Sequence, residues 1–432
     1  MKQIEKSPRL SALLILNKIL QKKHPLDFSF KKIIGQSVMS QQDKNFIYNL
    51  VLITLRNLGL IDALLSQLLK KPVPEKYFNS LNILRLGVCQ LLFLSTPAYA
   101  AISTSLQLID EIGEHGTKGM INAILRRLDR EHIELIAKID NIKTNIPSWL
   151  WNNWSNVYGE KICRKISKAS LVEAPLNLTV RIDADFWAAC LNAKITKTGS
   201  LQIQNSGPIS ALPGYYQGAW WVQDAASSLP VKLFGNIRGL DVADICAAPG
   251  GKTAQLLVAG AEVTAVDHSK NRVAILFDNL SRLELTATVI ETNAITWKPD
   301  KVFDAVLLDP PCSGTGTLRR HPDILRTRSP QDINDLYKIQ SKLLNNIAKL
   351  VRPGGILIYC VCSIQAEEGP IQVASFLERH SDYRLDKIRP SEIGGLSEAI
   401  TSEGHLRTLP FYRGCEGGMD GFFAARLIRN SY

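Results

Sequence analysis

Apolar residues recur at intervals of three and four positions through the first 140 residues of the chain. The stretches with this spacing are SALLILNKIL (11–20), NFIYNLVLITLRNLGLIDALLSQLL (45–69), LNILRLGVCQLLFL (81–94) and GMINAILRRLDR (119–130). Such spacing puts the apolar side chains on one face of a helix. Between these stretches lie KKPVPEKY and LSTPAYA, whose prolines interrupt helices. The pattern predicts an all-helical domain over residues 1–140.

The pattern changes over residues 141–235. This region begins with the tryptophan-containing PSWLWNNW and a helical stretch. Alternating apolar and polar positions follow in PLNLTVRI, and LQIQ predicts a second short strand. We expect a small α+β connector that ends near AWWVQDAASSLP.

From residue 236 onward, strand-like runs alternate with helical runs. The strand-like runs are GLDVADIC, EVTAVD, ATVIET, FDAVLLD and ILIYCVC, the last of them opened by the turn RPGG. The helical runs between them are KTAQLLVAG, SKNRVAILFDNLSRL and INDLYKIQSKLLNNIAKLV. This alternation predicts a mostly parallel, doubly wound α/β sheet, the Rossmann-like arrangement, over residues 236–432.

Composition narrows the class of protein. Hydrophobic residues make up 45% of the chain and charged residues 21%, which is typical of globular domains. No apolar run reaches the roughly 18 residues that a membrane span needs, so we expect no membrane partner. Eight cysteines at irregular spacing, without a secretion signal, indicate a reducing compartment. A cytoplasmic protein is therefore expected.

The positive charge is concentrated in the front half of the chain. Of the net charge of +11, residues 1–140 carry +7 and residues 141–235 carry +4, and the remainder is neutral. A basic module joined to a neutral one favours a partner that is a polyanion. Solvated lysines that only keep the protein soluble are the alternative reading of the same numbers.

Residues that can bind a ligand or take part in a reaction follow four of the predicted strands. They are the glycine turn after DVADIC, Asp267 after EVTAV, Asp309 after DAVLL and Cys362 after ILIYCV. In open α/β sheets, ligands bind beyond the carboxyl ends of the strands. The four features are therefore expected to meet at one edge of the sheet.

The glycine turn DICAAPGGKT (244–253) ends like a phosphate-binding loop but lacks its chemistry. A phosphate-binding loop has a glycine at the position that Cys246 occupies in this chain. Pro249 also lacks the backbone N–H that such a loop would donate to a phosphate. Gly250 and Gly251 still allow a ligand to approach the backbone closely. Asp267, at the end of the next strand, can accept both hydroxyls of a ribose. The glycine spacing of dinucleotide sites is absent, so a ribose-bearing cofactor other than NAD fits best.

The segment LLDPPCSGTG (307–316) indicates the reaction. An Asp-Pro-Pro loop can bind the amino group of a base, and Cys312 stands where enzymes that methylate exocyclic amines carry an aromatic ring. A thiolate that adds to carbon 6 of a pyrimidine activates carbon 5, and Cys362 offers a second thiol. Isolated cysteines are usually small buried hydrophobes, which is the reading for Cys89, Cys163, Cys190 and Cys360. Cys360 and Cys362 lack a second pair at zinc spacing, so no metal is expected.

Taken together, these motifs resemble those of the RsmB-type (Fmu/Sun) 16S rRNA cytosine-C5 methyltransferases, over essentially the whole chain. The strongest matches are DICAAPGGKT, LLDPPCSGTGTLRRHPD and CVCSIQAEEG, in the family's order. GMINAILRRL and LRLGVCQLLFL are similar to the NusB-type helical RNA-binding domain. The resemblance implies a NusB-like domain over 1–140, a ferredoxin-like RNA-binding connector over 141–235, and a class I S-adenosylmethionine-dependent methyltransferase domain over 236–432.

The resemblance also implies roles for individual residues. The cofactor S-adenosylmethionine would be held by Cys246, Ala247, Ala248, Pro249, Gly250, Gly251, Lys252, Asp267, Asn293 and Asp309. Cys362 would be the nucleophile, Asp309 would also hydrogen-bond the cytosine, and Cys312 would assist product release. The chain departs from the family at Asn293, where an aspartate is usual, and at Val361 and Ala366, where threonine and proline are usual. None of these changes removes a reactive group.

The implied activity is methylation of carbon 5 of cytosine 967 in 16S rRNA by a monomeric enzyme. Three alternatives stay open from the sequence. The enzyme could modify another rRNA or tRNA cytosine, or methylate an exocyclic amine instead of carbon 5. The chain could also be an RNA-binding assembly factor without catalytic activity, although the glycine turn, Asp267, Asp309 and both thiols speak against this.

Overall fold

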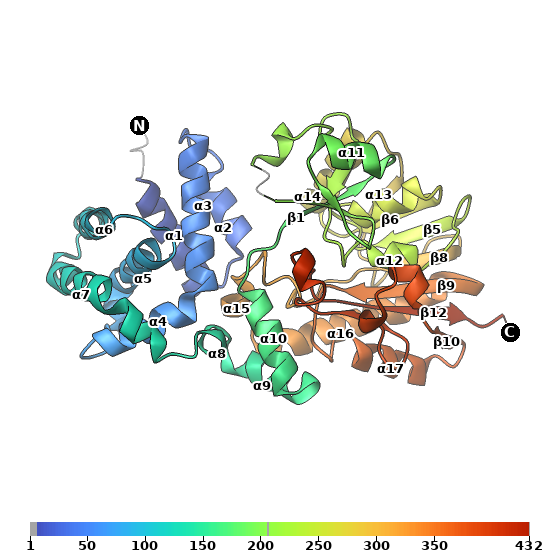
Figure 1. Cartoon of the computed structure of the whole chain (residues 1–432). Helices are drawn as coiled ribbons and strands as arrows, with labels where there is room; N and C mark the ends of the chain where they lie inside the picture. Colours follow the sequence, from blue (N-terminus) through green and yellow to red (C-terminus); the bar gives the residue numbers. More distant parts are fainter. Residues whose placement is uncertain (1–6, 205–206, 432) are drawn as a thin grey trace. The chain divides into compact units, whose positions relative to one another are not determined.

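A computed structural model describes residues 7–204 and 207–431, and these residues form two compact units (Figure 1). The first unit comprises the chain up to Leu171 together with Leu318–Ser329. The second comprises Val172–Thr317 and the chain from Pro330 onward. The residues predicted as a connector, 141–235, are therefore divided between the two units. The three-domain division at 140 and 235 stays a prediction.

The first unit is helical, as the apolar spacing predicts. Its helices are α1 (Pro8–Lys22), α2 (Leu26–Ile34), α3 (Gln41–Arg56), α4 (Leu58–Leu68), α5 (Phe78–Leu92), α6 (Ala98–Ile112), α7 (Lys118–Ala137), α8 (Asn141–Asn145), α9 (Ser148–Tyr158), α10 (Glu160–Ser170) and α15 (Ile324–Thr327). The long apolar stretch at 45–69 folds as two helices, α3 and α4, bent by 72° at Asn57. Within the described residues, no single helix meets the length and hydropathy of a membrane span, although this bent pair meets them jointly.

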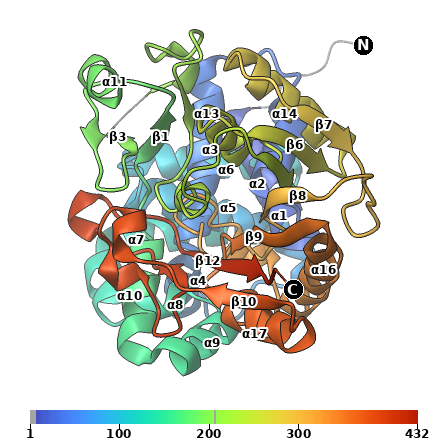
Figure 2. The same cartoon turned by 90° about the vertical axis from the view of Figure 1, so that its right-hand side faces the viewer.

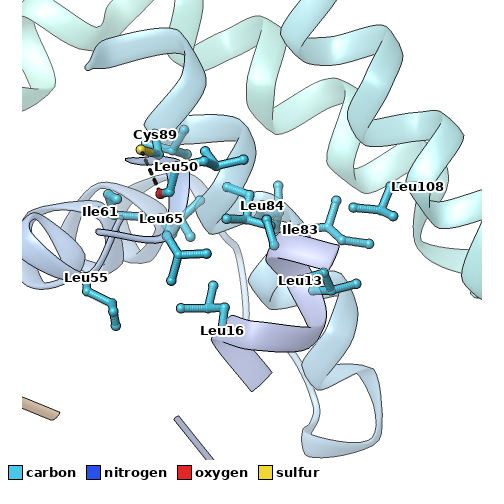
Figure 3. Close-up of a cluster of buried hydrophobic side chains, with 14 of the residues drawn as sticks. Leu13, Leu16, Leu50, Leu55, Ile61, Leu65, Ile83, Leu84, Cys89 and Leu108 are labelled. Atoms are coloured by element: carbon cyan, nitrogen blue, oxygen red, sulfur yellow. Dashed lines mark hydrogen bonds between the residues drawn. The ribbon is translucent and has the colours of Figure 1, made fainter. Parts of the chain in front are cut away.

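The apolar faces of helices α1 to α7 pack into one core (Figure 3). Leu16 of α1, Leu50 of α3 and Leu84 of α5 are fully buried in it. Cys89 of α5 is also fully buried, and its thiol lies 3.8 Å from the carbonyl oxygen of Leu50. Burial raises the pKa of this thiol to about 12, so it behaves as the small hydrophobe that the sequence predicts.

The segment Leu318–Ser329 joins the helical unit although it follows the Asp-Pro-Pro loop in the sequence. The backbone N–H of Leu26 donates to the buried Asp323 carboxylate at 3.1 Å, and Arg56 donates to the carbonyl of Arg319 at 3.0 Å. Arg326 donates to the carbonyl of Asn145 at 3.2 Å. Nothing in the sequence indicated that this segment packs with the helical unit, because apolar periodicity reports only on local structure.

A small antiparallel sheet begins the second unit. Its strands are β1 (Leu176–Val180), β2 (Lys194–Ile195), β3 (Leu201–Ile203) and β4 (Trp220–Val222), in the order β2-β3-β1-β4, with helix α11 (Ala184–Cys190). Leu178, Leu201 and Trp220 form its buried core. The strands predicted at PLNLTVRI and LQIQ are therefore present as β1 and β3.

The large sheet of the second unit is mostly parallel, as predicted. Its order is β10-β12-β9-β8-β5-β6-β7, with β11 also paired to β12. Figure 2 labels β10, β12, β9, β8, β6 and β7 of this sheet. The strands are β5 (Asp241–Ile245), β6 (Glu262–Asp267), β7 (Thr288–Glu291), β8 (Phe303–Leu308), β9 (Val351–Val361), β10 (Tyr383–Asp386), β11 (Leu406–Thr408) and β12 (Phe422–Arg429). Strands β5 to β9 pair in parallel, and β12 runs antiparallel to β9.

Side chains alternate between the two faces of this sheet, and each face is covered by helices. The helices are α12 (Leu229–Lys232), α13 (Gly251–Val258), α14 (Lys270–Arg282), α16 (Pro330–Ile347) and α17 (Pro370–Arg379). Val242 packs in one core with Leu256 of α13, whereas Ala243 packs in the other with Leu344 of α16. This is the doubly wound arrangement that the alternating pattern predicts.

Strand β9 begins earlier than the sequence predicts. The residues Arg352–Gly355, expected as a turn before the strand, lie inside it. Phe303 of β8 pairs with Val351, and Ala305 pairs with Ile356, so the pairing shifts across this segment. The extra residues form an irregularity in one strand, which a turn signal by itself does not distinguish from a loop.

Candidate active site

The structure brings the ends of the central strands into one row. Ile245 of β5 pairs with Val266 of β6 on one side and with Leu308 of β8 on the other. Leu308 in turn pairs with Tyr359 of β9. Since these strands are parallel, the residues that follow each of them lie at the same edge of the sheet. The glycine turn, Asp267, Asp309 and Cys362 are therefore neighbours along this edge.

The glycine turn has a backbone that requires glycine at one position. Gly250 has φ +105 and precedes the first residue of α13. A Cβ built there would lie 2.6 Å from a methyl carbon of the buried Leu276, so that side chain would have to shift. The absence of a side chain at Gly250 thus serves both the backbone conformation and the packing of the turn on α14.

Asp267 ties the glycine turn to the end of β6. Its carboxylate is buried and accepts hydrogen bonds from the backbone N–H groups of Ala248 and Ser269, both at 3.2 Å. The guanidinium of Arg272 donates to it at 3.1 Å. Two carboxylate oxygens offer about four acceptor positions, so capacity for a ligand hydroxyl is left.

Asp244 lies under the turn, inside β5. Its side chain is almost completely buried, and the hydroxyl of Thr253 in α13 donates to Oδ2 at 2.6 Å. Its other oxygen, Oδ1, has no hydrogen-bond partner among the described residues. Burial raises the pKa of Asp244 to about 7. A buried acceptor without a partner, next to a turn open to close approach, is consistent with a polar ligand at this edge.

Asn293 is exposed, as is Pro249 among the predicted cofactor residues. It follows β7, the strand next to β6, and its side-chain oxygen accepts from the N–H of Ile295 at 3.0 Å. The neighbouring Thr292 donates its N–H to the carbonyl of Asp267 at 3.0 Å. This places Asn293 on the same edge as the glycine turn.

Lys252 and Asp309 form an ion pair that the sequence did not reveal. The ammonium of Lys252 lies 2.7 Å from Oδ2 of Asp309 and 5.2 Å from the ring centre of Phe422. Burial would lower the pKa of Lys252, but attraction to Asp309 and to the thiol groups of Cys360 and Cys362 outweighs it, so the pKa is raised. Lys252 is therefore a fixed cation at the edge of the sheet.

The two thiols that follow β8 and β9 meet. The sulfur atoms of Cys312 and Cys362 are 3.4 Å apart, within the distance of an S–H···S hydrogen bond. This hydrogen bond, together with burial and the charges of Cys362, Glu368 and Asp309, raises the pKa of Cys312 well above its usual value. Cys312 is therefore held as a thiol beside Cys362.

The other cysteines have different surroundings. Cys360 is fully buried in the apolar core, as are Cys89 and Cys163, which confirms the prediction that these three are structural. The same prediction is wrong for Cys190, which is exposed at the end of α11. The apolar pattern around Cys190 belongs to a short helix with no buried residue. Among the residues that the structure describes, no cluster of three His, Cys, Asp or Glu side chains is placed to hold a metal.

A mostly parallel α/β sheet with a glycine turn, an acid after the next strand and two thiols beside an Asp-Pro-Pro loop fits an enzyme with a ribose-bearing cofactor, and similarity to known proteins defines its class as a methyltransferase that uses S-adenosylmethionine. The family model described as 16S rRNA methyltransferase RsmB/F matches residues 238–428, and that of the NusB family matches residues 6–130. Ribosomal RNA small subunit methyltransferase B of Escherichia coli O7:K1 is 33% identical over 411 residues, which cover 91% of this chain and 92% of that protein. The chain belongs to the RsmB/F family of 16S rRNA methyltransferases, as its motifs predicted, and is an rRNA cytosine-C5 methyltransferase.

Solved structures show the same fold. The crystal structure of PH0851 aligns with a TM-score of 0.77 and 21% identity, covering 99% of this chain and all of that one. The crystal structure of NSun6 from Pyrococcus horikoshii with SFG aligns with a TM-score of 0.58 and 18% identity, covering 66% of this chain and 98% of that one. The predicted fold class, a NusB-like helical domain followed by a Rossmann-like methyltransferase domain, is confirmed.

Proposed function

We propose that the chain methylates carbon 5 of cytosine 967 in 16S rRNA through a covalent bond between Cys362 and carbon 6 of that base. The observation that carries the proposal is the pair of sulfurs, 3.4 Å apart, at the strand edge that also bears the Lys252–Asp309 ion pair. Two thiols at a nucleotide-modifying site fit covalent catalysis, in which one forms the adduct and the other assists its breakdown.

The residues at this edge fit S-adenosylmethionine. The glycine-only backbone at Gly250, the remaining acceptor capacity of Asp267 and the unpartnered oxygen of Asp244 all suit a polar ligand with a ribose. S-adenosylmethionine, when bound, supplies the methyl group. The proposed residues that hold it are Cys246, Ala247, Ala248, Pro249, Gly250, Gly251, Lys252, Asp267, Asn293 and Asp309.

The first chemical step belongs to Cys362. Its thiolate forms a bond to carbon 6 of the cytosine, which is splayed out of the RNA, and the electron pair of the C5–C6 double bond moves to carbon 5. Asp309 accepts a hydrogen bond from the base, while Lys252 keeps the charge of Asp309 compensated at 2.7 Å. Carbon 5 then has the electron pair with which it takes the methyl group.

Release of the product reverses the addition. A base removes the proton from carbon 5, the C5–C6 double bond forms again, and the bond from carbon 6 to the Cys362 sulfur breaks. Cys312, held as a thiol, donates a hydrogen bond to the departing sulfur. Lys252 is a poor candidate for the general base that removes the carbon-5 proton, because its ion pair with Asp309 raises its pKa and keeps it protonated.

The experiment that tests the proposal is to map 5-methylcytosine in unmodified 16S rRNA after reaction with the protein and S-adenosylmethionine. We expect a single modified cytosine, at position 967. A methyl group on a different cytosine would correct the target and keep the chemistry. Methylation of an exocyclic amine, or no methylation at all, would contradict the proposal. Monomeric state, cytoplasmic location and independence of metals stay predictions.

Affinity for rRNA is expected to fall steeply with salt, because phosphate contacts release counterions. The basic charge of residues 1–235 predicts that this part of the chain makes most of these contacts. The measurement is the slope of log affinity against log salt concentration. Each duplex phosphate contact that is lost should reduce this slope by about 0.9. Binding that does not depend on salt would contradict the expectation.

A matched pair of triple variants tests where the phosphate contacts lie. The first neutralises exposed lysines of the helical unit and the second neutralises exposed lysines of the methyltransferase unit: Lys22, Lys70 and Lys71 to glutamine in one, and Lys298, Lys342 and Lys349 to glutamine in the other. The first variant should lower the salt slope and the second should leave it near its original value. Equal salt slopes for the two variants would contradict the prediction that residues 1–235 make most of the phosphate contacts.

A further inference from the structure

A buried carboxylate lies behind the two thiols. Glu368 follows β9 by seven residues and is completely buried. Both of its carboxylate oxygens accept hydrogen bonds: Oε1 from the backbone N–H of Ser313 at 2.8 Å and from the amide of Gln340 at 3.0 Å, and Oε2 from the hydroxyl of Ser363 at 2.6 Å and from that of Ser313. No ion pair to Glu368 is found among the residues that the structure describes.

The partners of Glu368 are the immediate chain neighbours of both thiols. Ser313 follows Cys312, and Ser363 follows Cys362. The two serine hydroxyls are also 3.0 Å apart. One carboxylate therefore connects the loop after β8 to the end of β9 at the two residues whose positions decide where the sulfurs lie. Gln340 adds α16 to this connection and also donates to the carbonyl of Pro311 at 3.0 Å.

Two further contacts hold the same loop at its far end. The N–H of Gly316 donates to the carbonyl of Cys362 at 3.1 Å, and the N–H of Gly421 donates to the carbonyl of Gly316 at 2.8 Å. A Cβ at Gly316 would lie 1.8 Å from the carbonyl oxygen of Gly421, so only glycine permits this approach. The loop that carries Cys312 is thus tied down on both sides of its thiol.

Burial of a carboxylate without an opposite charge is costly unless its oxygens are hydrogen-bonded. An apolar side chain would fill the same space without that cost. A fully hydrogen-bonded buried network instead specifies one arrangement of the groups that it joins. We propose that Glu368 is a positioning residue, which joins the segments bearing Cys312 and Cys362 and so holds the two sulfurs at hydrogen-bonding distance. This inference rests on the roles proposed above for the two thiols.

The variant that tests the inference is Glu368→Gln, which preserves size but presents an amide N–H₂ group where the carboxylate accepts only. The matched control is Glu378→Gln, an exposed position on the neighbouring helix α17. Both variants are compared with the unaltered protein by kcat and by KM for S-adenosylmethionine. A thiol crosslinker of short span, dibromobimane, then measures whether Cys312 and Cys362 still lie close together. The crosslinked peptide is identified by mass spectrometry.

We expect Glu368→Gln to lower kcat by about 100-fold, because misplacement of reacting groups by about 1 Å has effects of that size. KM for S-adenosylmethionine should stay unchanged, since Glu368 makes no contact with the glycine turn or Asp267 among its described hydrogen bonds. The Cys312–Cys362 crosslink should be lost, whereas the control should keep both activity and crosslink. A variant that merely loosened the fold would raise KM as well.

Unchanged kcat in Glu368→Gln would overturn the inference, and so would a lowered kcat with the crosslink intact. If this variant fails to fold, Ser363→Ala takes its place, because it removes one donor to the carboxylate and leaves Glu368 otherwise bonded. The same two readouts then decide. Failure of the proposed function is distinguishable, because it would appear as turnover without Cys362, whatever the result for Glu368.

Discussion

Cys362→Ala is expected to abolish methylation of rRNA while leaving the binding of S-adenosylmethionine intact. Without the thiol, no bond can form at carbon 6, and carbon 5 stays too poor a nucleophile to take the methyl group. Loss of a nucleophile typically lowers turnover by about 10⁴-fold or more. Cofactor affinity should not change, since the residues proposed to hold the cofactor are on the turn and on the ends of β6, β7 and β8. The measurements are incorporation of labelled methyl groups and calorimetric binding of S-adenosylmethionine.

Two control variants separate the nucleophile from the other thiols. Cys360→Ala removes a buried thiol two residues earlier, inside β9, and Cys190→Ala removes an exposed one. Both should keep turnover within a few fold of the original, because Cys360 packs in the core and the exposed Cys190 ends helix α11 beside the small sheet. Normal turnover in Cys362→Ala would refute the assignment, and loss of turnover in Cys360→Ala alone would move it to that residue.

Cys312→Ala is expected to trap the covalent enzyme–RNA adduct. Addition by Cys362 and methyl transfer do not need the second thiol, but departure of the Cys362 sulfur loses the S–H donor that lies 3.4 Å away. Turnover should fall by at least about 100-fold, because the intermediate accumulates instead of breaking down. The measurement is a gel under denaturing conditions, where labelled rRNA that is bound to the protein migrates more slowly.

The double variant Cys312→Ala, Cys362→Ala is the control for this experiment. It should give no shifted band, since the adduct needs the nucleophile. A band that persists in the double variant would mean that another residue bonds to the RNA. If Cys312→Ala gave no adduct and kept normal turnover, product release would not depend on the second thiol, and the 3.4 Å pair would need a different explanation.

Local sequence patterns predicted most of the second unit. Alternating strand-like and helical runs placed β5, β6, β8 and β9, and the parallel order followed from the helices between them. The residues of the candidate site were found because they follow these strands. The ion pair between Lys252 and Asp309 was missed, since the two residues are 57 positions apart and no local pattern reports on such a distance.

Two other tertiary features were not visible in the sequence, for the same reason. The segment Leu318–Ser329 was assigned to the methyltransferase domain by its place in the chain, but its buried Asp323 and Arg319 bond to helices near the N-terminus. Glu368 was visible only as one of two glutamates after the second thiol motif. A polar residue in such a place gives no sign of being buried until its donors, from Ser313, Ser363 and Gln340, are known.

The sequence by itself determined the helical first region and the α/β class of the second, and it predicted the residues for a ribose-bearing cofactor and the two cysteines for the chemistry. These features can be inferred from side-chain spacing and residue type, because both are local properties that extend over one or two helical turns or a single strand. Only the tertiary structure decided that Cys312 and Cys362 share a hydrogen bond, that Lys252 forms an ion pair with Asp309, and that Glu368 accepts hydrogen bonds from both thiol segments. These properties depend on the pairing of β8 with β9 and on burial, which remove water and let groups 50 residues apart act on one another.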